Sequence, residues 1–274
     1  MDVLPSASDI AQLVEFGEAE AYADMFAAAP PDLRLRVERI GSAFMLVADQ
    51  IDVMLCNRVI GLGVKEPATE VMVDAILTAY QRAGIRNFAL QISPIAQPAA
   101  LAEWLPVRHL IRADNWAKVY RAPAAAVDVP TDLRIARIGP ADAVAFASVA
   151  CVAFGLPDFL APWIARSVGR AGWYHYLAFD GDRPVATGAL FVRDHVGWLG
   201  MGSTLPSHRR RGAQGAVIAQ RIRDAAVAGC DWVVTETGED VPEHPNPSFH
   251  NMIRTGFVLA YQRPNYLWQA GVER

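Results

Sequence analysis

The 274-residue chain lacks the features that mark several classes of protein. It has only three cysteines, Cys56, Cys151 and Cys230, which lie far apart and form no CxxC pair, so they fit neither a disulfide framework nor a zinc site. It has no run of 18 or more apolar residues, and Met1 to Ile10 show no basic start followed by an apolar stretch. We therefore expect a cytoplasmic protein that has no membrane partner.

An excess of charge of one sign is also missing. The 25 basic and 29 acidic residues nearly balance, so the chain has no basic surplus to neutralise a phosphate backbone, and we expect no nucleic acid partner. What the chain has in quantity is apolar side chains, at 53% of its residues. This content excludes a disordered chain and is enough for one large domain or two domains with separate cores.

The stretch RAPAAAVDVPT, residues 121–131, has no helical or strand periodicity and reads as a connection between compact units. We place the boundary near residue 130 and predict two domains, residues 1–128 and 131–274. The second half shows a mixed α/β order. Its expected strands lie at 133–137, 173–179, 184–192, 196–204, in DWVVTET and at the end of the chain, and its helices at about 140–153, 158–169, 213–228 and 248–255.

Part of this order is present in the first half. The first half contains IGLG, a helix that ends at Gly84, the strand NFALQI and a closing strand NWAKVYR. Their counterparts in the second half are, in the same order, LGMG, a helix that ends at Gly229, WVVTET and NYLW. Gly61 and Gly200 are 139 residues apart but Gly84 and Gly229 are 145 apart, so the second half holds six extra residues there. They fall where RRRGAQG lies. Chance matches in an alanine-rich chain are the alternative to a duplication.

The segment STLPSHRRRGAQGAVIAQRI places small residues between a strand and a helix with apolar side chains at Val217, Ile218 and Ile222. The first N–H groups of a helix have no internal acceptor and the helix dipole is positive there, so a pyrophosphate fits this end. Gly212 and Ala213 would allow close backbone approach, and the arginines would add charge-assisted hydrogen bonds. We expect Gly212→Glu to abolish anion binding and leave the fold intact.

The alternative interpretation is a solvated basic loop. A cation just before a helix N-terminus is unfavourable by roughly 0.3–1 kcal/mol per exposed charge, which favours an anionic ligand over solvation alone.

These residues resemble the signature of the GNAT acetyltransferases: Arg or Gln, two free positions, Gly, one free position, then Gly or Ala, after a strand that ends in a hydrophobic-x-Pro. Here the match is Thr204-Leu205-Pro206 followed by Arg209, Gly212 and Gln214, where Gln214 departs from the pattern and Gly215 follows at once. NPSFHNMIRTGF, with Gly256-Phe257, resembles the asparagine-containing helix that follows in this family. The resemblance covers about residues 132–270.

The resemblance implies an α/β (α+β) fold of two tandem GNAT-like mixed-sheet domains, the acyl-CoA N-acyltransferase fold, with acetyl-CoA as cosubstrate. Backbone groups near Thr204 and Leu205 would pair with the pantetheine arm, and Asn246 would reach the cofactor. In the first half IGLGV is followed by KEPATE, without the glycine and arginines, so that half is expected to be degenerate. The implied cofactor-binding residues are Ser203, Thr204, Leu205, Arg209, Arg210, Arg211, Gly212, Ala213, Gln214, Gly215 and Asn246.

Acetyl transfer to an amine needs a base, a polarised thioester carbonyl and a proton for the leaving thiolate. Glu236, at the end of DWVVTET, is the candidate catalytic base because partial burial would raise its pKa. A solvated carboxylate at a strand end is the alternative. The family often has a tyrosine acid four residues before Gly-Phe, where this chain has Met252; Tyr261 and Tyr266 are candidate substitutes.

We expect no metal site, because His244 and His250 have no further ligands at suitable spacing, and His195 reads as a turn residue. There is no GxSxG elbow for a hydrolase. The predicted function is therefore an acyl-CoA dependent N-acetyltransferase that acts on a small-molecule amine, as a monomer or a homodimer. The alternative is a non-catalytic acetyl-CoA-binding regulatory protein, which the missing tyrosine hydroxyl favours.

Overall fold

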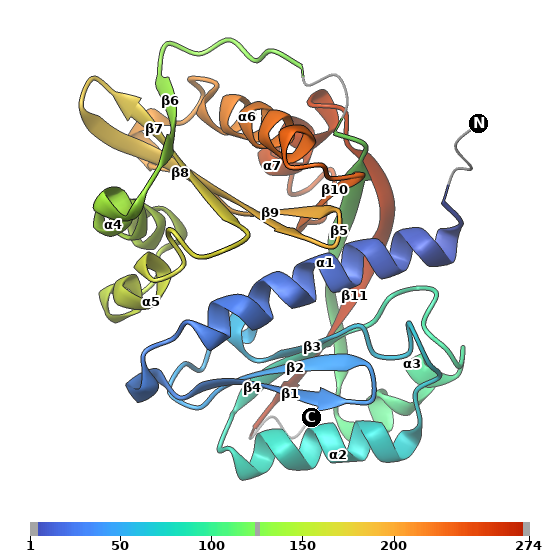
Figure 1. Ribbon diagram of the computed structural model, residues 1–274. Helices are drawn as coiled ribbons and strands as arrows, with labels where there is room; N and C mark the ends of the chain where they lie inside the picture. The colour runs from blue at the N-terminus through green and yellow to red at the C-terminus, as the bar shows by residue number, and fades with distance from the viewer. Residues whose placement is uncertain (1–4, 124–126, 271–274) are drawn as a thin grey trace. The chain divides into compact units, whose positions relative to one another are not determined.

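The computed structural model describes residues 5–123 and 127–270. The chain forms two compact units (Figure 1). Unit 1 comprises Met1–Lys118, Glu236–Glu239 and Leu259–Arg274, and unit 2 comprises Val119–Thr235 and Asp240–Val258. These units differ from the contiguous domains 1–128 and 131–274, because two segments from the second half of the chain group with the first unit. Residues 124–126 of the expected connection lie outside the described residues.

Unit 1 is a mixed sheet with helices on both of its faces. The sheet order is β1-β2-β3-β4-β11-β5. The helices are α1 (Ala7–Ala27), α2 (Glu70–Arg82) and α3 (Leu101–Trp104), with 3-10 turns at Pro31–Leu33, Met54–Cys56 and Pro106–Arg108. The strands are β1 (Leu35–Ile40), β2 (Ala43–Ala48), β3 (Arg58–Ile60), β4 (Asn87–Gln91), β5 (Ile111–Arg121) and β11 (Val258–Gln269).

Alternation along β4 explains how α1 and α2 take opposite faces of this sheet. Phe88 stacks on Tyr80 of α2, while Gln91 bonds Arg58 and Arg263 in the layer that also holds Glu18 of α1. The helix α1 is not among the elements predicted from the sequence. A signal for α1 was present, because Ser6 and Asp9 form a reciprocal capping box at its start.

In unit 2 the sheet is also mixed, and the first part of β10 is followed in order by β9, β8, β7 and β6. Its strands are β6 (Arg134–Ile138), β7 (Trp173–Asp180), β8 (Arg183–Arg193), β9 (Val196–Thr204) and β10 (Trp232–Gly238). Its helices are α4 (Ala143–Phe154), α5 (Ala161–Ala165), α6 (Ala213–Val227) and α7 (Pro247–Arg254), with 3-10 turns at Pro140–Asp142, Asp158–Leu160 and Pro206–His208. Most expected elements lie within a few residues of these bounds.

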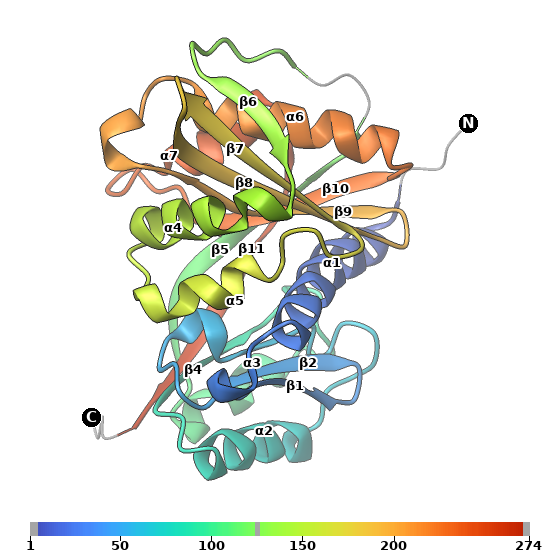
Figure 2. The same ribbon diagram turned by 60° about the vertical axis from the view of Figure 1, so that its left-hand side comes forward.

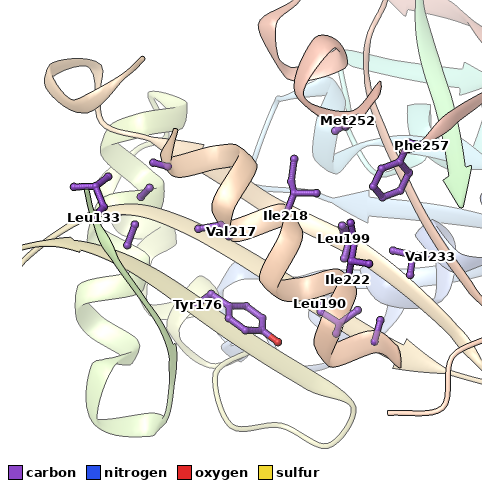
Figure 3. Close-up of a cluster of buried hydrophobic side chains, with 14 of the residues drawn as sticks. Leu133, Tyr176, Leu190, Leu199, Val217, Ile218, Ile222, Val233, Met252 and Phe257 are labelled. Carbon is purple, nitrogen blue, oxygen red and sulfur yellow. The ribbon is translucent and has the colours of Figure 1, made fainter. Parts of the chain in front are cut away.

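The two faces of the unit 2 sheet are covered by α4 and α6 (Figure 2). Tyr176 of β7 points towards α6 and bonds Asp224, whereas its neighbour His175 packs edge-on against Phe146 of α4. The α6 face holds an apolar core that includes Val217, Ile218, Ile222, Leu190, Leu199, Met252 and Phe257 (Figure 3). This core fixes α6, and therefore the loop that precedes it, against β8 and β9.

The two halves of the chain share a strand-helix-strand element. β3 and β4 pair in parallel with α2 between them in the chain, and β9 and β10 pair in parallel with α6 between them. The closing strands are exchanged. β11, from the end of the chain, pairs antiparallel with β4 through Tyr266 and Leu90, while β5, from the first half, is the neighbour of β10.

Among the described residues, no helix is both long and apolar enough to span a membrane. Cys56, Cys151 and Cys230 are buried free thiols.

Candidate acyl-CoA site

The last residues of β9 are bent by a β-bulge. Thr187 of β8 pairs with Ser203 and Ala189 pairs with Gly200, so Gly188 alone opposes two residues, Met201 and Gly202. Met201 has a φ of 53°, in the left-handed region that side chains rarely adopt. A bulge increases the local twist and re-aims the strand that follows it.

Hydrogen bonding between β9 and β10 changes just before this bulge. The parallel ladder joins Val196–Trp198 to Trp232–Val234, and at the next position the Thr235 hydroxyl donates to the Leu199 carbonyl instead. Within the described part of unit 2, no ladder pair joins β10 to β9 beyond Trp198. Backbone groups at the end of β9 are therefore placed for another partner. The Leu205 N–H is not among them, since it donates to the Val185 carbonyl.

The helix α6 begins after a glycine instead of a side-chain cap. Gly212 has a φ of 78° and occupies the N-cap position, where the described structure has no side-chain cap hydrogen bond. Ala213 follows as a buried first residue, and no acidic residue lies in that turn. The first N–H groups and the positive end of the helix dipole are thus left for an external anion.

The three arginines before this turn are not equivalent. Arg209 and Arg210 are exposed, and within residues 5–123 and 127–270 no carboxylate pairs with either guanidinium. Arg211 pairs with Asp132 and with Asp180, the latter at 2.7 Å. Hydrogen bonds from Arg211 lower the pKa of both aspartates. The structure therefore leaves two of the three predicted arginines available for a phosphate.

The glycines of the loop are packed against the segment that precedes unit 2's first strand. A Cβ on Gly212 would lie 2.3 Å from the Pro130 carbonyl oxygen, and one on Gly215 would lie 2.8 Å from Val129. The expectation that Gly212→Glu would leave the fold intact is therefore wrong: Gly212 combines a positive φ with a backbone contact that cannot accommodate a side chain.

Gln214, which departs from the family signature, joins α6 to α7. Its Nε2 donates to Ser248 Oγ (2.9 Å), and its Oε1 accepts from Asn251 Nδ2 (2.6 Å). Asn246, the predicted cofactor contact, is the N-cap of α7: its side-chain oxygen accepts from the N–H groups of Ser248 and Phe249. Ser248 and Asn251 are not among the residues predicted from the sequence, although both belong to the NPSFHNMIRTGF segment that carries the resemblance.

Glu236 lies in a buried network of charges in unit 1. Its side chain is 8% exposed, and its Oε2 is 2.9 Å from Lys118 Nζ, which also lies 2.8 Å from Glu18. Glu18 in turn pairs with Arg58 and Arg263. Burial, assisted by the Glu18 charge and opposed by Lys118, raises the pKa of Glu236. Burial alone would raise the pKa of Glu18, but Arg263, Lys118 and Arg58 hold it below its ordinary value.

The candidate acids, Tyr261 and Tyr266, and the position of Met252 have defined surroundings in the structure. Met252 is 7% exposed and belongs to the apolar core of unit 2, so no hydroxyl is supplied from that position. Tyr261 donates to Glu15 Oε1 (2.7 Å), and burial raises its pKa. Tyr266 packs in the apolar core of unit 1. Neither tyrosine belongs to the unit that contains Met252.

The corresponding helix of unit 1 begins differently. Thr69 caps α2 with its own side chain, which accepts from the Met72 N–H, and Glu70 follows in the first turn. The loop before it is tied to residue 97, because the Gln97 N–H donates to Gly63 and its carbonyl accepts from Ala68. A side-chain cap and a carboxylate both disfavour an anion at this end.

His195, His244 and His250 each have a separate local contact. Nε2 of His250 contacts Asp240 (2.9 Å), Nδ1 of His195 contacts the Gly229 carbonyl (2.9 Å), and His244 follows the turn at Val241. Over the described ranges, no group of three or more His, Cys, Asp or Glu side chains could hold a metal ion.

No family model matches the chain, and no curated protein matches it. Solved structures do. A GCN5-related N-acetyltransferase from Kribbella flavida is 19% identical with a TM-score of 0.66, over 94% of this chain and 96% of that one. One from Sphaerobacter thermophilus is 13% identical with a TM-score of 0.63, over 98% and 96%. A tandem GNAT protein from the clavulanic acid biosynthesis pathway is 14% identical with a TM-score of 0.60, over 98% of each chain.

The chain therefore has the GNAT acetyltransferase fold and matches a tandem GNAT structure along its full length. The fold and the resemblance that the sequence predicts are both confirmed. At these identities the likeness concerns the fold, and the chemistry has to be argued from the residues above.

Proposed function

We propose that this chain is an acyl-CoA dependent N-acetyltransferase in which unit 2 binds acetyl-CoA. One observation carries the proposal: α6 begins at a glycine without a side-chain cap, directly after Arg209 and Arg210, which are exposed and have no carboxylate partner among the described residues. Bare helix N–H groups combined with two cations form a site for the pyrophosphate of coenzyme A. The end of β9, at Ser203 and Thr204, would face the pantetheine arm with backbone groups that no ladder to β10 uses in the described part of unit 2.

The chemistry asks for a neutral amine, which forms a C–N bond to the acetyl carbon as the C–S bond breaks. Acetyl-CoA would supply the thioester that reacts. Glu236 would accept the proton that the amine releases, a role that its raised pKa supports. Its ion pair with Lys118 opposes this role, because an ammonium at 2.9 Å makes the carboxylate less basic. Coenzyme A would leave as the thiolate and take its proton from solvent.

A second candidate is a non-catalytic acetyl-CoA-binding regulatory protein. Two observations favour it: Met252 occupies the position where the family often has a tyrosine, and Glu236 already has a buried cationic partner. Both candidates share the cofactor site and differ in turnover.

In this proposal the acceptor is a small-molecule amine, and the protein has no nucleic acid or membrane partner. The mass of the protein in solution tests whether it forms a homodimer. Its three buried free thiols support a reducing, cytoplasmic location.

Calorimetric titration of acetyl-CoA into the purified protein tests the shared site. We expect one site per chain, because the corresponding helix of unit 1, α2, is capped by the Thr69 side chain and begins with Glu70; the absence of binding would refute both candidates. Release of free thiol from acetyl-CoA in the presence of an amine panel then distinguishes them. Turnover with any amine supports the enzyme, and binding without thiol release over the whole panel supports the regulatory protein.

A further inference from the structure

Arg221 is a buried cation that donates its hydrogen bonds to backbone carbonyls. It lies on α6 and is 3% exposed, and in the described part of the chain no ion pair joins its guanidinium to an acidic side chain. Burial lowers the pKa of Arg221 to about 10, so the side chain is still protonated at neutral pH. A buried charge without a counter-ion is expensive and persists only when dipoles replace water around it.

Those dipoles come from the backbone at the bulge. Nη1 of Arg221 donates to the carbonyls of Ala189 (3.1 Å) and Gly200 (3.0 Å), and Nε donates to Val217 (3.2 Å). Ala189 and Gly200 form the strand pair directly next to the bulge in β9. Arg221 therefore donates to two carbonyls beside the interrupted ladder.

Space for the guanidinium comes from two glycines. A Cβ on Gly188 would lie 3.1 Å from Arg221 Cζ, and one on Gly202 would lie 3.5 Å from Nη2. Both glycines belong to the bulge itself, one on each strand. The bulge and the arginine are thus mutually fitted: the strands leave room for the side chain, and the side chain satisfies their carbonyls.

The backbone of Met201 needs such support. Its φ of 53° is unfavourable for a residue with a side chain, and conformations of this kind persist where the surroundings impose them. The Met201 carbonyl accepts from Thr187 Oγ1 (2.7 Å), while Arg221 holds the carbonyl of the preceding Gly200. The peptide groups on both sides of the Met201 α-carbon are therefore anchored by side chains.

We propose that Arg221 is a positioning residue for acyl-CoA, which keeps the bulge of β9 open so that the backbone of Ser203 and Thr204 is presented to the pantetheine arm. This inference rests on the proposed function of unit 2. Without the guanidinium, closing the bulge into a regular ladder would shift the register by one residue and turn the following side chains to the opposite face. The arginine acts through β9 and does not contact the cofactor.

Arg221→Met keeps the length of the side chain and removes its donors. We expect acetyl-CoA affinity to fall by roughly tenfold or more, as for the loss of one well-placed set of hydrogen bonds. Binding of 3′,5′-ADP, which lacks the pantetheine arm, should stay within about twofold because the loop from Arg209 to Gly215 is retained. Tyr176→Phe removes another buried hydrogen bond from the same core, to Asp224, and is the control for a loss of stability alone.

A second-site change separates positioning from stability. Glycine adopts a positive φ without strain, so adding Met201→Gly to Arg221→Met should restore part of the acetyl-CoA affinity relative to Met201→Gly alone. Arg221→Lys, which retains one donor group, should be intermediate. If Arg221→Met folds poorly, the same comparison is made between Arg221→Lys and its combination with Met201→Gly.

Hydrogen exchange of the protein without cofactor supplies a readout that needs no ligand. Amides of residues 199–205 should exchange faster in Arg221→Met, and not in Tyr176→Phe. Unchanged exchange there, or equal losses of affinity for acetyl-CoA and 3′,5′-ADP, would overturn the role of Arg221. If the unmodified protein binds neither ligand, the proposed function fails, while the exchange result still decides whether Arg221 holds the bulge.

Discussion

Replacing Arg209 and Arg210 together with glutamine should weaken acetyl-CoA binding about 100-fold. The magnitude follows from their setting, because both are exposed and unpaired in the described structure and precede a helix that has no side-chain cap. Hydrogen bonds to charged groups contribute about 1.5–3 kcal/mol each, and we take the lower value because these side chains are solvated. Two such bonds give about 3 kcal/mol, or roughly 100-fold in the dissociation constant.

The matched control is Arg211→Gln. Arg211 is adjacent in sequence but pairs with Asp132 and Asp180, so its loss should change acetyl-CoA affinity several-fold less than the double substitution. Calorimetric titration at two salt concentrations measures both variants. The affinity of the unmodified protein should fall with added salt, and that dependence should shrink in the Arg209 and Arg210 double variant.

Equal affinity losses for Arg211→Gln and the double variant would refute this reasoning. That result would mean that the ion pairs of Arg211 break when the cofactor binds, or that the loop is reshaped as a whole. An unchanged affinity in the double variant would remove the arginines from the site.

Three further predictions follow from particular side chains. Gln214→Ala should lower the free energy of unfolding by about 1–3 kcal/mol, for two lost hydrogen bonds, and leave acetyl-CoA affinity within about threefold; a collapse of affinity would place Gln214 in the cofactor site. If Glu236 is the base, Glu236→Gln should reduce kcat by about 100-fold. Because the pKa of Glu236 is raised, the activity of the unmodified enzyme should fall on the acidic side at a pH above 4.5, the ordinary pKa of a glutamate. A Glu236→Gln variant with the turnover of the unmodified protein would exclude this role. His175 is buried and neutral, and burial lowers its pKa from 6.5 to about 4, so the stability that depends on the neutral ring is present above pH 6.5 and is lost as pH falls towards 4. The loss amounts to about 3 kcal/mol, to be seen in denaturant unfolding at several pH values, and should be absent in His175→Gln.

Local sequence signals predict unit 2 well because its elements are set by short-range chemistry. Alternating apolar residues give the strands from 173 to 204, and the glycine before Ala213 together with Gly229 brackets α6, which the structure places at Ala213–Val227. The loop between β9 and α6 was predicted from its residue types. Which of its arginines are available to a phosphate could not be predicted from the sequence. Arg211 pairs with Asp132 and Asp180, which lie far from it in the chain.

The pairing of the closing strands in the repeat was likewise not predictable from local sequence. The closing strands NWAKVYR and NYLW have similar patterns, and either could in principle pair with either buried strand. In the structure each lies beside the parallel strand of the other half, as β11 does with β4. Pairing of strands far apart in the chain depends on the sum of many cross-strand contacts, and no local motif encodes it.

The sequence by itself determined the fold class, the tandem arrangement and the position of the candidate acyl-CoA loop, because periodicity, turns and helix starts depend on neighbouring residues. Only the tertiary structure decided the surroundings of the charged residues. Arg221 resembles an ordinary helix-surface charge in RIRDAA, and Glu18 resembles another in α1, yet both are buried. The burial of such a charge is set by distant dipoles and partners, here the carbonyls beside the bulge for Arg221 and the cations of β3, β5 and β11 for Glu18.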